Sequence, residues 1–187
     1  MTFEIGERVV HPQHGLGYVV SMEVRAFEPG VNHAYYEISI PGGSTVWVPI
    51  KGTGSGVRKL ATRDEIARCR MILKSPPAEL AEDARMRQSE LNAHLKKGTI
   101  ASHCEVVRDL AAYGAHRSMF GNIGAFLRAA QDVLSQEWAL VEGTTLAEAA
   151  FEITALLETG KQAMSEAVPS ENAPEEGEMP ASGEDVP

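Results

Sequence analysis

Several features that would mark a particular class of protein are missing from this chain. Its 187 residues include two cysteines, Cys69 and Cys104, and no Cys-x-x-Cys pair, which argues against a disulfide framework. No apolar run approaches the roughly 18 residues that a membrane-spanning helix needs. Residues 1–5 are not a basic segment leading into an apolar one, so no secretion signal is visible. We therefore expect a cytoplasmic protein with two buried thiols and no membrane contact.

A recognisable catalytic constellation is also missing. No nucleophile elbow or Cys–His pairing stands out. The glycine-rich residues 51–56 resemble a phosphate loop, but Val57-Arg58-Lys59 follows where the motif needs Lys and Ser or Thr. His11 and His14 have a spacing found in metal sites, yet no carboxylate or thiol is near them in the sequence. We predict a protein that is not an enzyme and holds neither a metal nor a cofactor.

Positive charge is scarce overall and unevenly placed. The net charge is -9, with 17 Lys and Arg against 26 Asp and Glu. By segment, residues 1–60 carry 5 - 5 = 0, residues 61–128 carry 11 - 8 = +3, residues 129–166 carry 1 - 7 = -6, and residues 167–187 carry 0 - 6 = -6. Any contact with a polyanion would therefore come from the middle segment.

The first 60 residues show the spacing of short strands. Val9-Val10 and Val19-Val20 flank Pro12, Gly15 and Gly17, which predicts a strand, a tight corner with a bulge or sharp bend, and a second strand. Further strand-like stretches at 33–40 and 45–50 are separated by a proline-glycine hairpin connection. Four to five such strands predict a small SH3-like or Tudor-like β-barrel.

Helical periodicity begins at Thr62, where a capping residue precedes Glu65 by three positions. Further helices are expected over roughly 78–97, 100–114 and 125–141, with Gly121 and Gly124 interrupting before the fourth, and a fifth after Gly143. Trp138 falls on the apolar stripe of the fourth helix. The fold class is therefore α+β: a barrel in residues 1–60, a compact five-helix domain in residues 61–166, and a disordered acidic tail in residues 167–187.

Two features suggest binding. Trp47 alternates with Val46 and Val48, so it points away from the core if the two valines point inward. It is then either an exposed anchor for a partner, with Arg25 on the same surface, or a cap beneath the helical domain. The second feature is the basic content of residues 61–128, which forms either a phosphate-binding face or ordinary charged helix surfaces.

The chain resembles the CarD/CdnL family of bacterial transcription regulators over about residues 1–157. The matching words are Phe3-Glu4-Ile5-Gly6-Glu7-Arg8-Val9-Val10-His11-Pro12, His14-Gly15-Leu16-Gly17, Ala34-Tyr35-Tyr36-Glu37-Ile38, Val46-Trp47-Val48-Pro49, Glu105-Val106-Val107-Arg108-Asp109-Leu110 and Glu137-Trp138-Ala139-Leu140. The resemblance implies a Tudor-like domain that docks on the β subunit of RNA polymerase. It also implies a helical domain at the upstream edge of the promoter bubble.

The resemblance assigns the contact with the β subunit to Arg25, Val46, Trp47 and Val48, joined by strand pairing. The basic content of residues 61–128 supplies the candidates for promoter DNA, which are Arg85, Arg87, Lys96, Lys97 and Arg128.

One departure from the family pattern concerns DNA. Many members carry a Trp on the second helix that wedges into the minor groove, and that position falls at or near Ala84 here. No aromatic residue lies between Val57 and Tyr113, and Met86 is the one large apolar residue near the place. We therefore expect a monomeric regulator that binds polymerase and modulates open-complex stability with weak or atypical DNA contact. The alternative is an adaptor that docks on polymerase, or a similar lobe, and recruits another protein without touching DNA.

Overall fold

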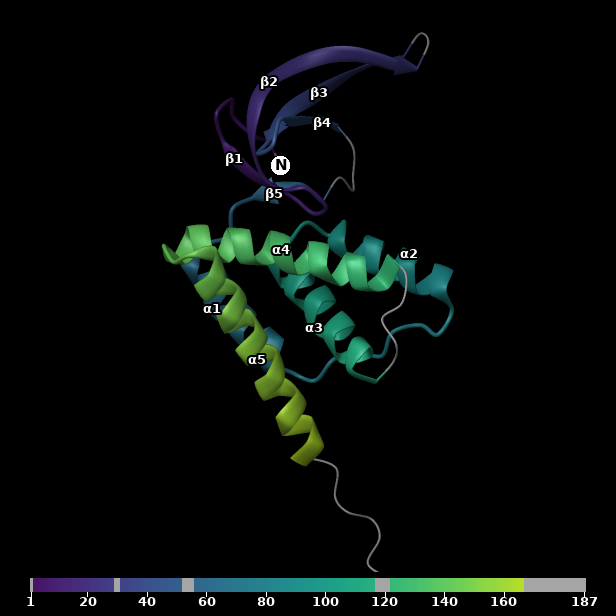
Figure 1. The fold of residues 1–187 in the computed structure, drawn as a ribbon. Coiled ribbons are helices and arrows are strands. Elements are labelled where there is room, and N and C mark those ends of the chain that lie inside the picture. The colour runs from purple at the N-terminus through teal and green to yellow at the C-terminus, as the bar shows by residue number, and fades with distance from the viewer. Residues whose placement is uncertain (1, 29–30, 52–55, 117–121, 167–187) are drawn as a thin grey trace, which may run out of the picture.

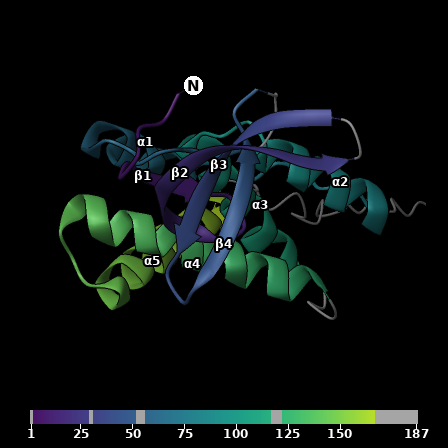
Figure 2. The ribbon, with the colours of Figure 1, turned by 90° about the horizontal axis from the view of Figure 1, so that it is seen from above.

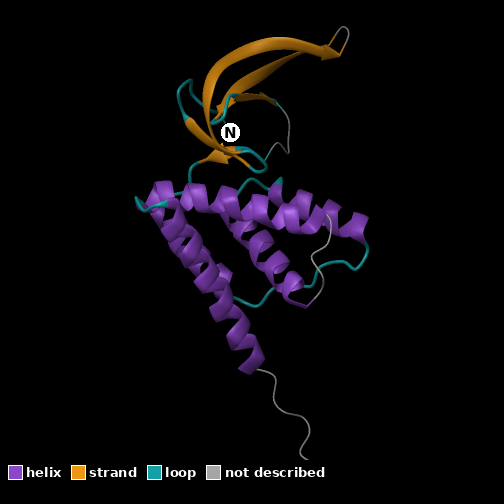
Figure 3. Ribbon diagram, viewed as in Figure 1, coloured by secondary structure: helices purple, strands orange, loops and turns teal. Residues whose placement is uncertain are grey.

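A computed structural model describes residues 2–28, 31–51, 56–116 and 122–166, and within these a sheet sits on top of a group of helices (Figure 1). The strands are β1 (Arg8–His11), β2 (Gly15–Glu28), β3 (Val31–Ile40), β4 (Ser44–Pro49) and β5 (Arg58–Lys59). The helices are α1 (Arg63–Lys74), α2 (Ala84–Leu95), α3 (Ile100–His116), α4 (Asn122–Glu142) and α5 (Leu146–Glu166). Figure 3 shows the division plainly, with every strand above every helix.

The five strands form one antiparallel sheet in the order β4-β3-β2-β1-β5. Its inner face buries a compact apolar cluster. The members of that cluster are Phe3, Val9, Val19, Tyr36, Ile38, Ile40, Val48 and Val57. This curled sheet fits the predicted Tudor-like barrel, followed by five helices, and confirms the α+β fold class. β2 and β3 are longer than expected, with 14 and 10 residues, and arch away from the barrel as a ribbon.

The corner between β1 and β2 is tighter than the sequence suggested. Gly15 begins β2 with φ +74°, a left-handed conformation that favours glycine. Gly17 is already part of β2 and pairs with Val9, so the prediction of a bend there was wrong. A Cβ on Gly17 would come within 2.7 Å of Ile38 and 2.8 Å of Ile40, so glycine is needed for close packing instead. The pairing of β2 with β3 shifts register further along, between Val19 and Ser21 and again between Arg25 and Glu28.

The helices bury two apolar clusters, a smaller one of Leu91, Leu95, Val106 and Leu110 and a larger one that contains Trp138, whose side chain is fully buried as predicted. α1 begins with the predicted capping box between Thr62 and Glu65. Cys69 and Cys104 are buried and unbridged in the larger cluster, which confirms the expectation for the thiols. No helix among residues 63–74, 84–116 and 122–166 is long and apolar enough to cross a membrane.

Two helix boundaries differ from prediction. The second helix starts at Ala84 rather than near 78, because the Asp83 side chain caps it by accepting a hydrogen bond from Met86 N at 2.8 Å. The preceding segment is held in an extended path, since Ala78 N donates to the Asp109 carboxylate at 2.9 Å. Gly124 does not interrupt the fourth helix, which already begins at Asn122 and buries this glycine. The predicted 167–187 tail lies outside the described residues.

Candidate protein and nucleic-acid interface

The outer edge of the sheet is strand β4. Within the described residues β4 pairs with β3 alone, whereas the opposite edge, β5, leads directly into the helical domain. An edge strand presents a row of unpaired backbone N–H and C=O groups to which another chain can add a strand. Seen from above, β2, β3 and β4 overlie the helices (Figure 2).

The side chains of β4 alternate as the sequence predicted. Val48 is buried and Val46 is half-buried, and both pack on the barrel core. Trp47 therefore points to the other face, where it is half-buried. Its ring is sealed neither in the barrel core nor in the helical core. The valines can meet a partner through their backbone groups, and Trp47 can do so through its indole.

Arg25, from the outer part of β2, reaches across to this indole. Its guanidinium lies 3.6 Å from the centroid of the Trp47 ring, the geometry of a cation–π stack. The same guanidinium donates from Nε at 3.1 Å and from Nη2 at 3.0 Å to one oxygen of Glu23. The structure thus brings the predicted pair Arg25 and Trp47 together, and adds Glu23, which orients the arginine and which sequence reasoning missed.

The α2 end of the molecule carries the first group of predicted DNA-contacting residues. Ala84 and Arg85 are exposed, and Met86 has 59 % of its surface exposed. Arg87 is half-buried, because its guanidinium lies 4.7 Å from the centroid of the Tyr113 ring and donates to the Ala81 and Glu82 carbonyls. Arg87 is therefore occupied with holding the start of α2.

The other predicted DNA-contacting residues are spread over the domain. Lys96 and Lys97 are exposed just after the C-terminal end of α2, near the barrel, and Arg128 is exposed on α4. Figure 2 shows α2 and α4 lying apart over most of their length. The predicted DNA-contacting residues thus come from α2, from the turn after it and from α4. A hollow of about 630 Å³ beside α2 is lined by Arg85 and Arg87 together with Ser89, Leu91, Asn92 and Ile123, among others.

Comparison with known proteins agrees with this two-part arrangement. The model of the CarD-like/TRCF RID domain matches residues 3–61, which contain the sheet, and the model of the CarD C-terminal domain matches residues 69–154, within the helices. The chain belongs to the CarD family. Its resemblance to a family of transcription regulators is thereby confirmed. A relative from Bacillus subtilis (strain 168), named "Putative transcription factor YdeB", is 25% identical over 145 residues, covering 76% of this chain and 94% of the relative.

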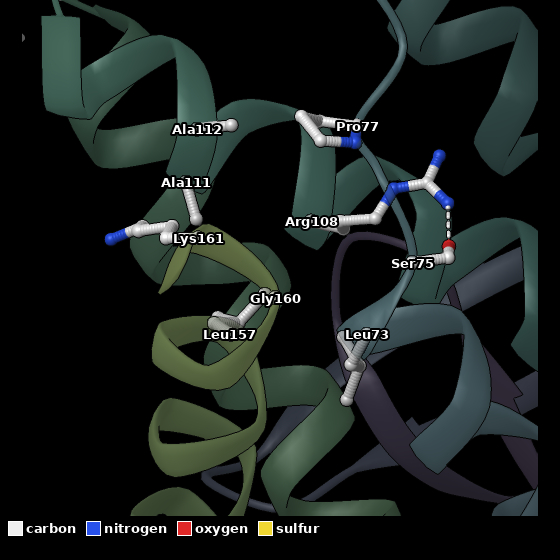
Figure 4. A pocket seen from close by; sticks show the side chains of 9 residues that line it. All are labelled: Leu73, Ser75, Pro77, Arg108, Ala111, Ala112, Leu157, Gly160 and Lys161. Atoms are coloured by element: carbon white, nitrogen blue, oxygen red, sulfur yellow. Dashed lines mark hydrogen bonds between the residues drawn. The ribbon is translucent and has the colours of Figure 1, made fainter. Parts of the chain in front are cut away.

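In this CarD-family chain one apolar crevice is too small for a ligand. It lies between the end of α1 and the last turns of α5, and Figure 4 shows Leu73, Leu157 and Gly160 lining it. Its volume is about 10 Å³, room for about one water molecule. Arg108 at its rim donates to Ser75 Oγ at 2.7 Å and to Asp109 at 2.8 Å. These contacts make the crevice a packing feature.

Histidines do not assemble a metal site in the described part of the chain. The His11 and His14 rings lie 4.5 Å apart, but His11 Nδ1 accepts hydrogen bonds from the backbone N–H groups of Gln13 and His14. Burial, with a smaller effect of His14, lowers the pKa of His11 to about 4. Across residues 2–28, 31–51, 56–116 and 122–166, no group of three or more His, Cys, Asp or Glu side chains is placed to hold a metal ion.

A buried ion pair between the two domains escaped sequence reasoning. Arg58 on β5 and Glu137 on α4 form a bidentate ion pair, and both side chains are buried. The partners are 79 positions apart, and no local pattern links them. The one available signal was that Arg58 is a basic residue at the end of the barrel sequence and Glu137 an acidic residue on the apolar side of a predicted helix.

Proposed function

We propose that this CarD-family protein is a transcription regulator that binds the β subunit of bacterial RNA polymerase through β4 and the stacked Arg25 and Trp47. The helical domain then contacts promoter DNA weakly and shifts the stability of the open complex. A binder that favours one state of the complex by about 1.4 kcal/mol shifts its population about tenfold. We further propose that it acts in the cytoplasm as a monomer.

The observation that carries this proposal is the edge at β4. Within the described residues β4 has a single neighbouring strand, and it carries Trp47. Arg25 from β2 stacks on the Trp47 indole and orients it. Strand addition supplies affinity through main-chain hydrogen bonds, and the indole and guanidinium supply anchors of the kind that dominate interface energetics. Because β4 is the edge of the sheet opposite β5, which leads into the helices, both domains can engage partners at once.

The test is binding to a polymerase β-lobe fragment, measured by calorimetry. We expect Trp47→Ala to weaken binding by about 2 kcal/mol, roughly 30-fold, and Arg25→Glu by a similar amount. Phe151→Ala is the matched control, because Phe151 is 78 % exposed but lies on α5 in the helical domain. Equal affinity of all four proteins for the fragment would contradict the proposal.

A specific observation favours a second candidate, the adaptor that recruits another protein without touching DNA. The exposed residue near the expected wedge position is Ala84, and alanine cannot unstack bases as a bulky side chain does. The exposed Met86 on the same turn is the nearest apolar substitute. In vitro transcription separates the two candidates, because only the regulator changes the lifetime of the open complex in a reaction holding polymerase and promoter alone.

The number of exposed candidate cations limits how many phosphates the protein can contact. Four exposed cations are candidates, namely Arg85, Lys96, Lys97 and Arg128. Each neutralised phosphate contributes about 0.9 to the slope of log K against log salt concentration, so we expect a slope no steeper than about -4. The double change Lys96→Ala and Lys97→Ala reduces the slope by about 2 if both contact phosphates, with Lys74→Ala on α1 as the control. Salt-independent binding would exclude phosphate contacts.

A further inference from the structure

The barrel and the helices approach each other closely at two glycines. At Gly15, an added Cβ would lie 2.8 Å from Gln136 Oε1 on α4. At Gly56, an added Cβ would lie 2.9 Å from the Leu95 carbonyl oxygen at the end of α2 and 2.9 Å from Pro12. Interfaces between domains of one chain usually permit relative motion. Contacts this close leave the two parts little room to slide.

One charged pair crosses this interface. Arg58 on β5 presents both of its terminal nitrogens to the two oxygens of Glu137 on α4, as a fork meeting a fork. Glu137 Oε1 also accepts a hydrogen bond from the backbone N–H of Ala61 at 2.8 Å, just ahead of α1. The carboxylate therefore ties together the last strand of the barrel, the connection to α1, and the middle of α4.

The burial of this pair suits it to fixing geometry more than to adding stability. Glu137 is fully buried and Arg58 is 6 % exposed, and every buried side-chain nitrogen and oxygen in the described residues has a hydrogen-bond partner. Removing two charges from water offsets much of their attraction, so a satisfied buried pair adds little net stability over apolar side chains of similar size. Its bidentate geometry, however, is met in one relative orientation of the two elements.

We propose that Arg58 and Glu137 are positioning residues that hold the barrel in one fixed orientation on the helical domain. The strand edge at β4 and the α2 face then form a single rigid unit. The fixed orientation of the barrel on the helices does not depend on any partner. Its consequence, that a partner bound at β4 fixes where α2 can reach, rests on the proposed function.

The orientation is measured by the distance between spin labels on Ser39→Cys in β3 and Glu90→Cys in α2, both exposed positions. With the native pair we expect one narrow distance distribution. In the apolar double variant, Arg58→Met with Glu137→Leu, we expect a melting temperature within a few degrees of the parent but a clearly broadened distribution. A narrow distribution at the parent distance in this folded variant would overturn the proposal.

A milder change keeps the test decisive if the double variant does not fold. Arg58→Lys retains the charge but loses the planar fork, so we expect a broadened distribution and a melting temperature lower by roughly 10 °C. The matched control is Arg70→Lys, because Arg70 pairs with Glu152 within the helical domain, at 2.6 Å from Nε. The control should keep the narrow distribution. Equal distributions in the two lysine variants would overturn the proposal.

Two measurements on the unlabelled Arg58→Lys protein, its affinity for the β-lobe fragment and its effect on open-complex lifetime, separate this inference from the proposed function. We expect its affinity for the β-lobe fragment to match the parent within twofold, while its effect on open-complex lifetime falls at least fivefold. A parent protein that fails to bind the fragment would overturn the proposed function and leave the distance result standing. A variant with full effect on the open complex would overturn the link between fixed orientation and function.

Discussion

At the scale of single residues, His103 shows how burial determines a protonation state. Its side chain is buried on α3, and Nε2 lies 2.8 Å from the Ala130 carbonyl oxygen. Because a carbonyl oxygen only accepts, Nε2 carries the proton and donates it. Burial, partly opposed by this hydrogen bond, lowers the pKa of His103 to about 4. The folded protein therefore holds this imidazole neutral at all but acidic pH.

This pKa predicts an acid sensitivity. The unfolded chain binds a proton near pH 6.5 and the folded chain only near pH 4, so the stabilisation is complete above pH 6.5 and is lost as the pH falls between these values. From pH 7 to pH 5 we expect His103 to account for about 1–2 kcal/mol of lost unfolding free energy. Urea unfolding at both pH values should show a smaller difference for His103→Gln than for the parent. His33→Gln, on the exposed part of β3, is the control, and an unchanged difference in His103→Gln would contradict the assignment.

Sequence reasoning at this scale reached the direction of side chains but not their contacts. The alternation of Val46, Trp47 and Val48 gave the correct faces, because a strand has a period of two. The stack of Arg25 on Trp47 depended on the register of three strands, β2, β3 and β4. That register includes two irregularities in the pairing of β2 with β3, which residue spacing does not reveal.

At the scale of elements, the start of α1 was readable from the sequence. The Thr62 side chain accepts from Glu65 N at 3.2 Å, and the Glu65 carboxylate accepts from Thr62 N at 2.8 Å. The bond from Thr62 N to the carboxylate lowers the pKa of Glu65 from its ordinary value. Both partners are local, so a four-residue pattern suffices to predict them.

The capping box predicts a measurable loss. We expect Thr62→Ala to lower the free energy of unfolding by about 1 kcal/mol, because the N–H of Glu65 loses its acceptor. Thr154→Ala is the matched control, since Thr154 is exposed in mid-helix and its hydroxyl donates back to the Ala150 carbonyl at 2.9 Å. Chemical denaturation of both variants checks this. Equal losses would show that the cap is not the cause.

The start of α2 was not readable for a physical reason. This helix buries only Leu91 and Leu95, so its apolar pattern is weak and other contacts decide where it begins. Those contacts are the Asp83 cap, the hold of Asp109 on Ala78, and the reach of Arg87 to the Ala81 carbonyl. One of them comes from α3, which the sequence around α2 does not specify.

At the scale of the whole molecule, the join between barrel and helices depends on Gly56. Its φ of +69° and the 2.9 Å approach of the Leu95 carbonyl oxygen both exclude a larger side chain. We expect Gly56→Ala to lower the unfolding free energy by about 3 kcal/mol, from left-handed strain plus displacement of backbone. Gly42→Ala, with φ +102° and open space around it, carries strain alone and should lose only about 1–2 kcal/mol. Thermal melts of both proteins decide whether the close approach matters.

The whole-molecule arrangement was the part that sequence could not supply. The α+β class, the order of barrel and helices and the buried Trp138 follow from local periodicity. The Arg58–Glu137 pair and the seating of Gly15 on α4 join positions far apart in the chain, and nothing local fixes their proximity. The same limit applies to the predicted DNA residues, which looked like one basic segment and lie on α2, in the turn after it and on α4.

The concealment of Cys69 and Cys104 has a practical consequence. Burial, with the neighbouring Cys69, raises the pKa of Cys104 well above its usual range, so the reactive thiolate is scarce. Maleimide reagents should modify neither native cysteine in the folded protein and both after denaturation. A single cysteine introduced on the barrel rim is then a clean handle for fluorophores or crosslinkers, with the native sulfur atoms left in place.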